Sequence, residues 1–116
     1  VDRIRALYPA MPIIGFPKGA GLLYKDYFES TGVTTLAVDA QLPLSYIRHE
    51  LQPQGCVQGN LDPFALCAGG AEMLRHCDEI LSQLDPSKLI FNLGHGIDKH
   101  TPPEHVSMLV NHIRAR

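Results

Sequence analysis

The sequence predicts an α/β protein made of consecutive parallel β/α units. Three observations lead to this fold class: four short apolar runs, a helical pattern after each run, and strand onsets spaced roughly 20 to 35 residues apart. The apolar runs are nearly continuous, as in parallel strands with both faces buried. Two architectures fit, a small doubly wound sheet or half of a (β/α)₈ TIM barrel, since a whole barrel needs about 250 residues.

The first two units are predicted between Met11 and Asp39. The run MPIIGF is the first strand, and LLYKDYFESTG is a helix whose apolar face carries Leu23 and Tyr27, with Leu22 and Phe28 nearby and Gly32 as its C-cap. The β-branched segment VTTLAVD, which ends at Asp39, is the second strand. A short helix is expected to follow, beginning near Pro43.

The last two units begin with the strand GCVQGN, residues 55–60. Asp62 and Pro63 then form a helix N-cap and first turn. The next helix has apolar residues at steps of three and four, and after the strand KLIFNL the last helix has a similar stripe. Thr101 and Glu104 have the spacing of a capping box with Pro102 in the first turn. The stripes consist of Met73, Leu74, Cys77, Ile80, Leu81 and Leu84, and of Val106, Leu109, Val110 and Ile113.

Composition excludes several classes of function. The 116 residues fit one domain, and a formal net charge of -2 gives no reason to expect nucleic acid or an anionic membrane as partner. No run approaches the roughly 20 apolar residues of a membrane helix. The three cysteines are an odd number without metal-type spacing, which indicates reduced, structural thiols in a cytoplasmic protein.

Each predicted strand ends in polar residues or glycine, which favours a ligand-binding face. In both architectures the ligands bind at the carboxyl ends of the strands. Polar loops with helix caps are a structural alternative for any single loop, but four in succession favour a ligand. The residues concerned are Pro17, Lys18, Gly19 and Gly21, then Asp39 and Gln41, then Gln58, Gly59, Asn60 and Asp62, and finally Asn92, Gly94, His95 and Gly96.

His95 is the strongest single candidate in this set. Its imidazole changes charge near neutral pH, and the glycines on both sides, Gly94 and Gly96, permit unusual backbone angles and close approach of a ligand. The alternative is a turn histidine bonded to a neighbouring backbone group. Asp39 could instead form a purely structural salt bridge with Lys18, and KGAG lacks the P-loop pattern needed for a phosphate site.

The remaining histidines are expected to lie on the surface. No acidic residue or cysteine stands at metal-ligand spacing from the pair His105 and His112, so no metal site is expected. The sequence also has no serine nucleophile elbow and no HExxH motif. The other histidines are His49, His76 and His100.

Three segments, VQGNLDP (57–63), FNLGHGI (91–97) and TPPEHV (101–106), together resemble the C-terminal third of uroporphyrinogen decarboxylases. IGFPKGAG and GVTTLAVD resemble the two preceding strand–loop units of the same family, so the likeness covers nearly the whole chain. No single motif is decisive, but the ordered set is highly specific. One departure is Ala40, where many relatives carry tryptophan.

The resemblance implies a TIM barrel and a homodimeric, cytoplasmic carboxy-lyase of haem and porphyrin biosynthesis. Such enzymes convert uroporphyrinogen to coproporphyrinogen by removing the carboxyl groups of four acetate side chains, without metal or organic cofactor. The family's active-site histidine maps onto His95, with Gly94 and Gly96 as substrate-binding neighbours. Asp39, Lys18 and Asn60 are weaker substrate-binding candidates, and Asp39 does not map onto the family's essential aspartate.

That aspartate and the substrate-gripping arginines belong to the N-terminal part of the family, which this sequence lacks. Because the sequence also begins at Val1, we expect residues 1–116 to be the C-terminal part of a longer enzyme, inactive and prone to self-association alone. Two alternatives remain. One is a related zinc- or cobalamin-type methyltransferase, whose thiol ligands these loops lack; the other is a non-enzymatic βα module that binds an acidic small molecule.

Overall fold

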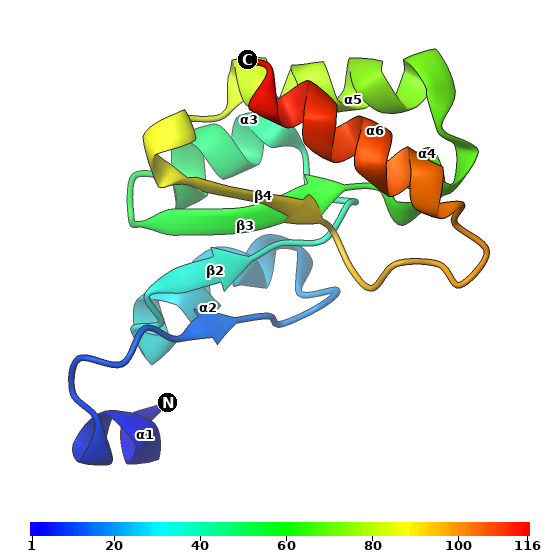
Figure 1. The fold of residues 1–116 in the computed structure, drawn as a ribbon. Coiled ribbons are helices and arrows are strands. Elements are labelled where there is room, and N and C mark those ends of the chain that lie inside the picture. Colours follow the sequence, from blue (N-terminus) through cyan, green and yellow to red (C-terminus); the bar gives the residue numbers. More distant parts are fainter.

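The computed structural model describes residues 1–116 and contains one parallel sheet with helices in its connections (Figure 1). The strand order in the sheet equals the order in the chain, so the consecutive parallel β/α units are confirmed. Register pairs Leu36 with Val57 and Asn60 with Asn92. The strands are β1 (Ile14–Gly15), β2 (Thr35–Ala37), β3 (Cys56–Leu61) and β4 (Leu89–Leu93).

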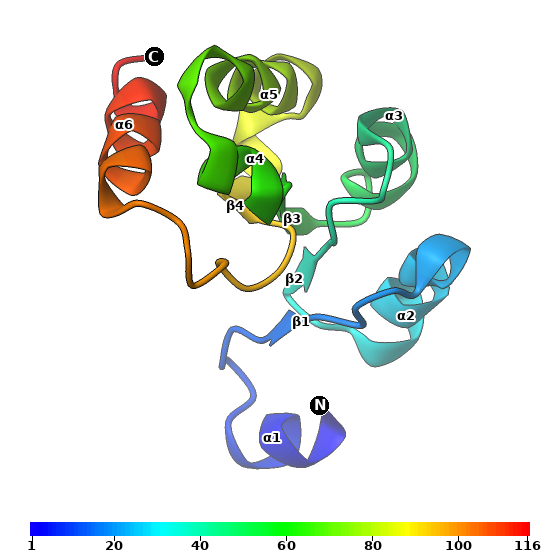
Figure 2. The ribbon, with the colours of Figure 1, turned by 90° about the vertical axis from the view of Figure 1, so that its right-hand side faces the viewer.

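Six α-helices accompany the strands, and four of them follow one another in an arc around the sheet: α2, α3, α5 and α6 (Figure 2). Helix α1, a short N-terminal helix that buries none of its residues, was not predicted. No helix has the length and apolarity that a membrane span requires. The bounds are α1 (Asp2–Leu7), α2 (Tyr24–Thr31), α3 (Leu44–Tyr46), α4 (Pro63–Ala68), α5 (Gly70–Gln83) and α6 (Pro103–Arg114), with 3₁₀ turns at Gly21–Leu23 and Pro86–Lys88 and a π-helical turn at Ile47–Leu51.

Two of the predicted helix ends are confirmed and one is wrong. Gly32 ends α2 in the left-handed conformation, and the Asp62 carboxylate accepts a hydrogen bond from the Phe64 backbone N–H at the start of α4. The capping box is absent, because α6 begins at Pro103 and its N-cap is Pro102. A residue before proline avoids the helical conformation, so Pro102 stays extended and Thr101 lies too far out to cap the helix.

The core lies between the sheet and the arc of helices. On α5 the predicted stripe is confirmed, with Met73 and Cys77 fully buried. On α2 the predicted face is partly right: Phe28 is buried and Tyr27 packs against the core, but Leu22 and Leu23 are 78% and 63% exposed, and Tyr24 is buried in their place. The preceding 3₁₀ turn has three residues per turn rather than 3.6, which shifts the phase of the apolar residues before α2 begins.

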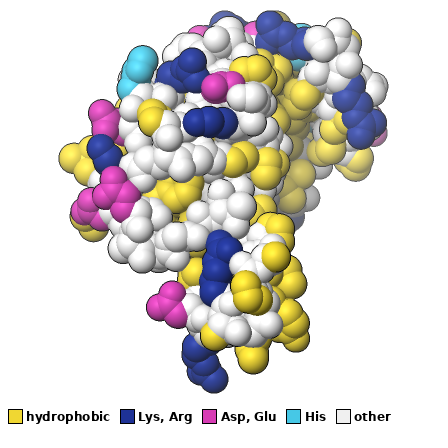
Figure 3. All heavy atoms as spheres, turned by 90° about the vertical axis from the view of Figure 1, so that its left-hand side faces the viewer, with side chains coloured by type: hydrophobic (Ala, Val, Ile, Leu, Met, Phe, Trp, Pro, Cys, Tyr) yellow, Lys and Arg dark blue, Asp and Glu magenta, His cyan; other side chains and the backbone are white.

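The expectation that every strand is buried on both faces is wrong for the outer strands. All three residues of β2 are buried, but Ile14 of β1 is 50% exposed and Ile90 of β4 is 42% exposed. Both strands are sheet edges, and the arc of helices covers only one face of the sheet (Figure 2). Figure 3 shows hydrophobic side chains gathered along one side of the molecule and on the lower lobe that α1 forms.

Candidate active site

The carboxyl ends of all four strands meet at one edge of the sheet. The Asn60 side chain, at the end of β3, donates a hydrogen bond from Nδ2 to the Leu42 carbonyl oxygen at 3.0 Å. The Gly94 N–H, just after β4, donates to the Leu61 carbonyl oxygen at 2.8 Å. These contacts join the loops that the sequence marked as a ligand face, because parallel strands bring their carboxyl ends to the same side.

His95 lies at this edge and lines a cavity of about 580 Å³. Its ring is half-buried, and Nδ1 lies 3.3 Å from the Gly96 carbonyl oxygen. This is the neighbouring-backbone contact that the turn alternative anticipates, but it occupies only one ring nitrogen. The other ring nitrogen, Nε2, has no hydrogen-bond partner within the chain. Neither Gly94 nor Gly96 has a positive φ, so the expected unusual backbone angles are absent.

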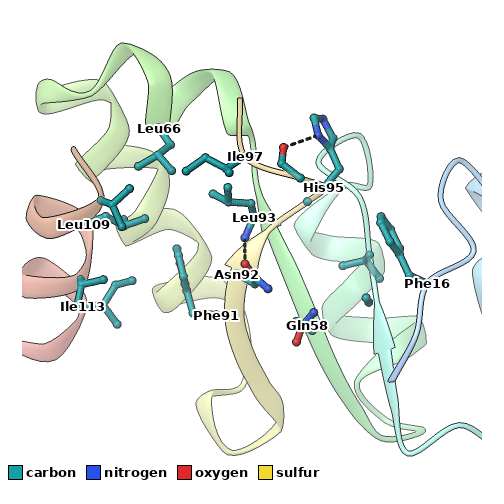
Figure 4. Close-up of a pocket in the computed structure, with 16 residues that line it drawn as sticks. Phe16, Gln58, Leu66, Phe91, Asn92, Leu93, His95, Ile97, Leu109 and Ile113 are labelled. Atoms are coloured by element: carbon teal, nitrogen blue, oxygen red, sulfur yellow. Dashed lines mark hydrogen bonds between the residues drawn. The ribbon is translucent and has the colours of Figure 1, made fainter. Parts of the chain in front are cut away.

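The cavity reaches both sides of β4 (Figure 4). On one side the lining includes Phe16, Gln58, Asn92 and His95. On the other side the lining is apolar and comes from β4, α4 and α6. That second group consists of Leu66, Phe91, Leu93, Ile97, Val106, Leu109, Val110 and Ile113. The apolar lining was not expected as part of the site, because sequence periodicity marks these residues only as core.

Asp39 is buried and does not pair with Lys18 as the structural alternative supposed. Its Oδ2 accepts hydrogen bonds from the Tyr24 hydroxyl at 2.7 Å and from the Gly19 N–H at 3.0 Å, and Oδ1 accepts from the Gln41 N–H at 3.0 Å. The backbone amide next to Lys18 therefore takes the place expected for its ammonium group. Burial and the Asp39 carboxylate raise the pKa of Tyr24, which keeps its hydroxyl a donor.

The ionisation of Asp39 is coupled to folding. Burial raises the pKa of its carboxyl, but hydrogen bonds from Tyr24, Gly19 and Gln41 outweigh burial, so the pKa lies below its ordinary value of 3.8. A carboxyl whose pKa is lowered by folding stabilises the native state above its unfolded pKa and loses that contribution as pH falls through the folded pKa.

We therefore expect the stability difference between wild type and Asp39→Asn to be largest at neutral pH and to shrink below about pH 4. Urea unfolding at a series of pH values measures this difference. Other acidic groups titrate in both proteins and cancel in the comparison. A difference that stays constant from pH 7 to pH 3 would contradict a folding-linked Asp39 carboxylate.

Gly94 and Asn60 both have structural contacts within the site. A Cβ atom on Gly94 would overlap the backbone nitrogen of Ala40 and lie 2.8 Å from its Cα, so the loop after β4 rests directly on the main chain after β2. Asn60 is 7% exposed, and its side-chain amide donates to main-chain carbonyl oxygens. Gly96, by contrast, is exposed and has open space around it.

Two of the histidines expected on the surface have structural partners instead. Nδ1 of His105 contacts the Leu66 carbonyl oxygen at 2.9 Å, and Nε2 of His112 contacts Asp78 Oδ1 at 2.7 Å. Cys77 lies beside His112 and Asp78, and the ligand atoms of these three residues lie within 4.8 Å of one another. Their spacing along the chain did not reveal this trio.

The trio has the character of a helix–helix contact between α5 and α6 rather than of a metal centre. Arg116 occupies the same Asp78 oxygen at 3.0 Å. Cys77 is fully buried, and burial raises the pKa of its thiol to about 11, which disfavours the thiolate that metals bind.

Comparison with known proteins identifies the family. The sequence profile described as "Uroporphyrinogen decarboxylase (URO-D)" matches residues 1–116. Proteins named uroporphyrinogen decarboxylase from Chelativorans sp. (strain BNC1), Brucella anthropi and Brucella ovis are 50%, 48% and 47% identical to this chain over 114 residues. The alignments cover 98% of this chain but 33% of each relative, so the chain spans about a third of their length. On this evidence, the chain belongs to the uroporphyrinogen decarboxylase family.

Proposed function

We propose that residues 1–116 are the C-terminal part of an enzyme that decarboxylates uroporphyrinogen to coproporphyrinogen. The observation that carries the proposal is the match to proteins of that name along the whole chain. The cavity lined by His95, its two glycine neighbours and Gln58 supports it, although Lys18, Asp39 and Asn60 do not line that cavity. Because those relatives are named decarboxylases, decarboxylation is favoured over methyl transfer and over binding without activity.

In each of the four steps, the bond between an acetate methylene and its carboxylate breaks and carbon dioxide leaves. Protonation of the pyrrole first makes the ring an electron sink. After carbon dioxide leaves, a second proton adds to the exocyclic methylene to form a methyl group, and the ring loses the first proton to become a neutral pyrrole again. The site must hold the substrate carboxylates and stabilise positive charge on the pyrrole. We assign the first task in part to His95, whose imidazole can donate a hydrogen bond to a carboxylate.

The remainder of the barrel is proposed to cover what this chain leaves open. β1 and β4 are edge strands, and exposed Ile14 and Ile90 lie on them. Edge strands with exposed apolar residues favour pairing with further strands. The family's essential aspartate and arginines would come from that remainder. A homodimer and a cytoplasmic location are part of the same proposal, and the three free cysteines fit a reducing compartment.

The test is anaerobic incubation of uroporphyrinogen with the full-length enzyme and, separately, with residues 1–116 alone. We expect the full-length enzyme to form coproporphyrinogen with release of four equivalents of carbon dioxide. We expect the isolated chain to show no turnover above buffer, because it lacks the essential aspartate. A full-length enzyme without turnover would overturn the proposed function, and stoichiometric zinc in that protein would favour the methyltransferase alternative.

A further inference from the structure

We propose that Asp39 is a positioning residue of this site, which holds the strand-end loops in the arrangement that the reaction needs. The inference rests on the proposed decarboxylase function and adds a role that the resemblance does not assign. Asp39 would act through the loops that it binds rather than by touching the substrate.

The Asp39 carboxylate joins three separate segments of the chain. Gly19 belongs to the loop after β1, Tyr24 begins α2, and Gln41 belongs to the loop after β2. The Tyr24 hydroxyl also accepts a hydrogen bond from the Asp39 N–H at 3.2 Å, so this hydroxyl both donates to Asp39 and accepts from it. One side chain thereby fixes three segments of the first two β/α units.

The main chain around Asp39 contacts the other two β/α units. Asn60 Nδ2, at the end of β3, lies 3.4 Å from the Asp39 carbonyl oxygen. The close contact of Gly94 also involves the Asp39 carbonyl carbon, which a Cβ atom would approach to 2.8 Å. His95 is the next residue in the chain. All four strand ends therefore contact Asp39 or its immediate backbone.

The Asp39 carboxylate has little hydrogen-bonding capacity left for a substrate. Asp39 is 7% exposed, and its two oxygens already accept three hydrogen bonds. Yet the segments that Asp39 joins or contacts carry Phe16 and His95, which both line the cavity. A displacement of about 1 Å in such groups can cost roughly 100-fold in rate.

The experiment compares Asp39→Asn with Asp85→Asn in the full-length enzyme. Asparagine has the same shape but one acceptor oxygen, so its NH₂ group must face the Gly19 or Gln41 N–H and release one loop. Asp85 is a matched control: its carboxylate accepts hydrogen bonds from the Ser87 N–H and hydroxyl at the opposite end of β4. Rates are compared per folded enzyme, with the folded fraction taken from circular dichroism.

We expect Asp39→Asn to lower kcat about 10- to 100-fold with a smaller change in KM, and Asp85→Asn to stay within about twofold of wild type. Tyr24→Phe removes one donor but keeps the charge, so we expect a milder loss. It also serves as the test if Asp39→Asn does not fold. Equal kinetics for Asp39→Asn and Asp85→Asn, or an unaffected Tyr24→Phe when only that variant folds, would overturn the proposal.

Amide hydrogen exchange separates this inference from the proposed function. If the wild-type enzyme does not decarboxylate uroporphyrinogen, the proposed function fails, but exchange at residues 18–20 and 40–42 still tests the role of Asp39. Faster exchange in at least one of these segments in Asp39→Asn than in Asp85→Asn would support the positioning role. Unchanged exchange in both segments would overturn it.

Discussion

Replacement of His95 by asparagine in the full-length enzyme should lower kcat/KM for uroporphyrinogen by about 100-fold, the usual effect of removing one well-placed donor from an active site. The asparagine Nδ2 atom sits near the position of the histidine Nδ1 atom. It can therefore keep the 3.3 Å contact with the Gly96 carbonyl oxygen while the second ring nitrogen is lost. The variant thus separates a role toward the substrate from a role in the turn.

His100→Asn is the matched control, since His100 lies in the same connection between β4 and α6 and contacts Asp98 at 3.1 Å. We expect this variant to decarboxylate at the wild-type rate. Steady-state kinetics under anaerobic conditions compare the two variants. A fully active His95→Asn would return His95 to the role of a turn residue, and equal losses in both variants would point to a general disturbance of the connection.

The Gly94→Ala substitution should destabilise the native state by about 3 kcal/mol, at the upper end of the usual cost of overpacking. The added methyl group would meet the backbone nitrogen and Cα of Ala40, and main-chain atoms cannot rotate away as a side chain would. Relief requires the loop after β4 to move away from the loop after β2. We therefore expect the activity of the folded variant to fall as well, because His95 moves with Gly94.

Gly96→Ala provides the control for this prediction. A Cβ at that position has open space, and the residue has no positive φ, so the free energy of unfolding should change by less than about 0.5 kcal/mol. Urea unfolding monitored by circular dichroism measures both variants. Similar transition midpoints for Gly94→Ala and wild type would mean that the two loops are not in contact in solution.

Local sequence signals predicted most of the fold. The strands, the Asp62 N-cap, the Gly32 C-cap and the apolar stripe of α5 all depend on residues within one or two turns of each other. The predictions that failed at the start of α6 and on the face of α2 also have physical reasons. The capping box required a choice between two adjacent prolines as the helix start, and the face of α2 depended on the 3₁₀ turn before it.

The site was predictable in its location but not in its contacts. Because the sheet is parallel, the convergence of Asp39, Asn60 and His95 at one edge follows from their places after successive strands. The partners of Asp39 do not follow in the same way. Its charge suggested Lys18, whereas burial favoured Tyr24, which lies 15 residues earlier and reaches the carboxylate only once α2 packs on the sheet.

The contact between Gly94 and Ala40 has a consequence for how this part of the protein tolerates divergence. Its atoms on the Ala40 side are a backbone nitrogen and a Cα, which every amino acid possesses. The contact therefore makes no demand on the side chain at position 40, which is alanine in this chain. Position 94 has no such freedom, because any other residue brings a Cβ. This contact therefore tolerates substitution at position 40 but not at position 94.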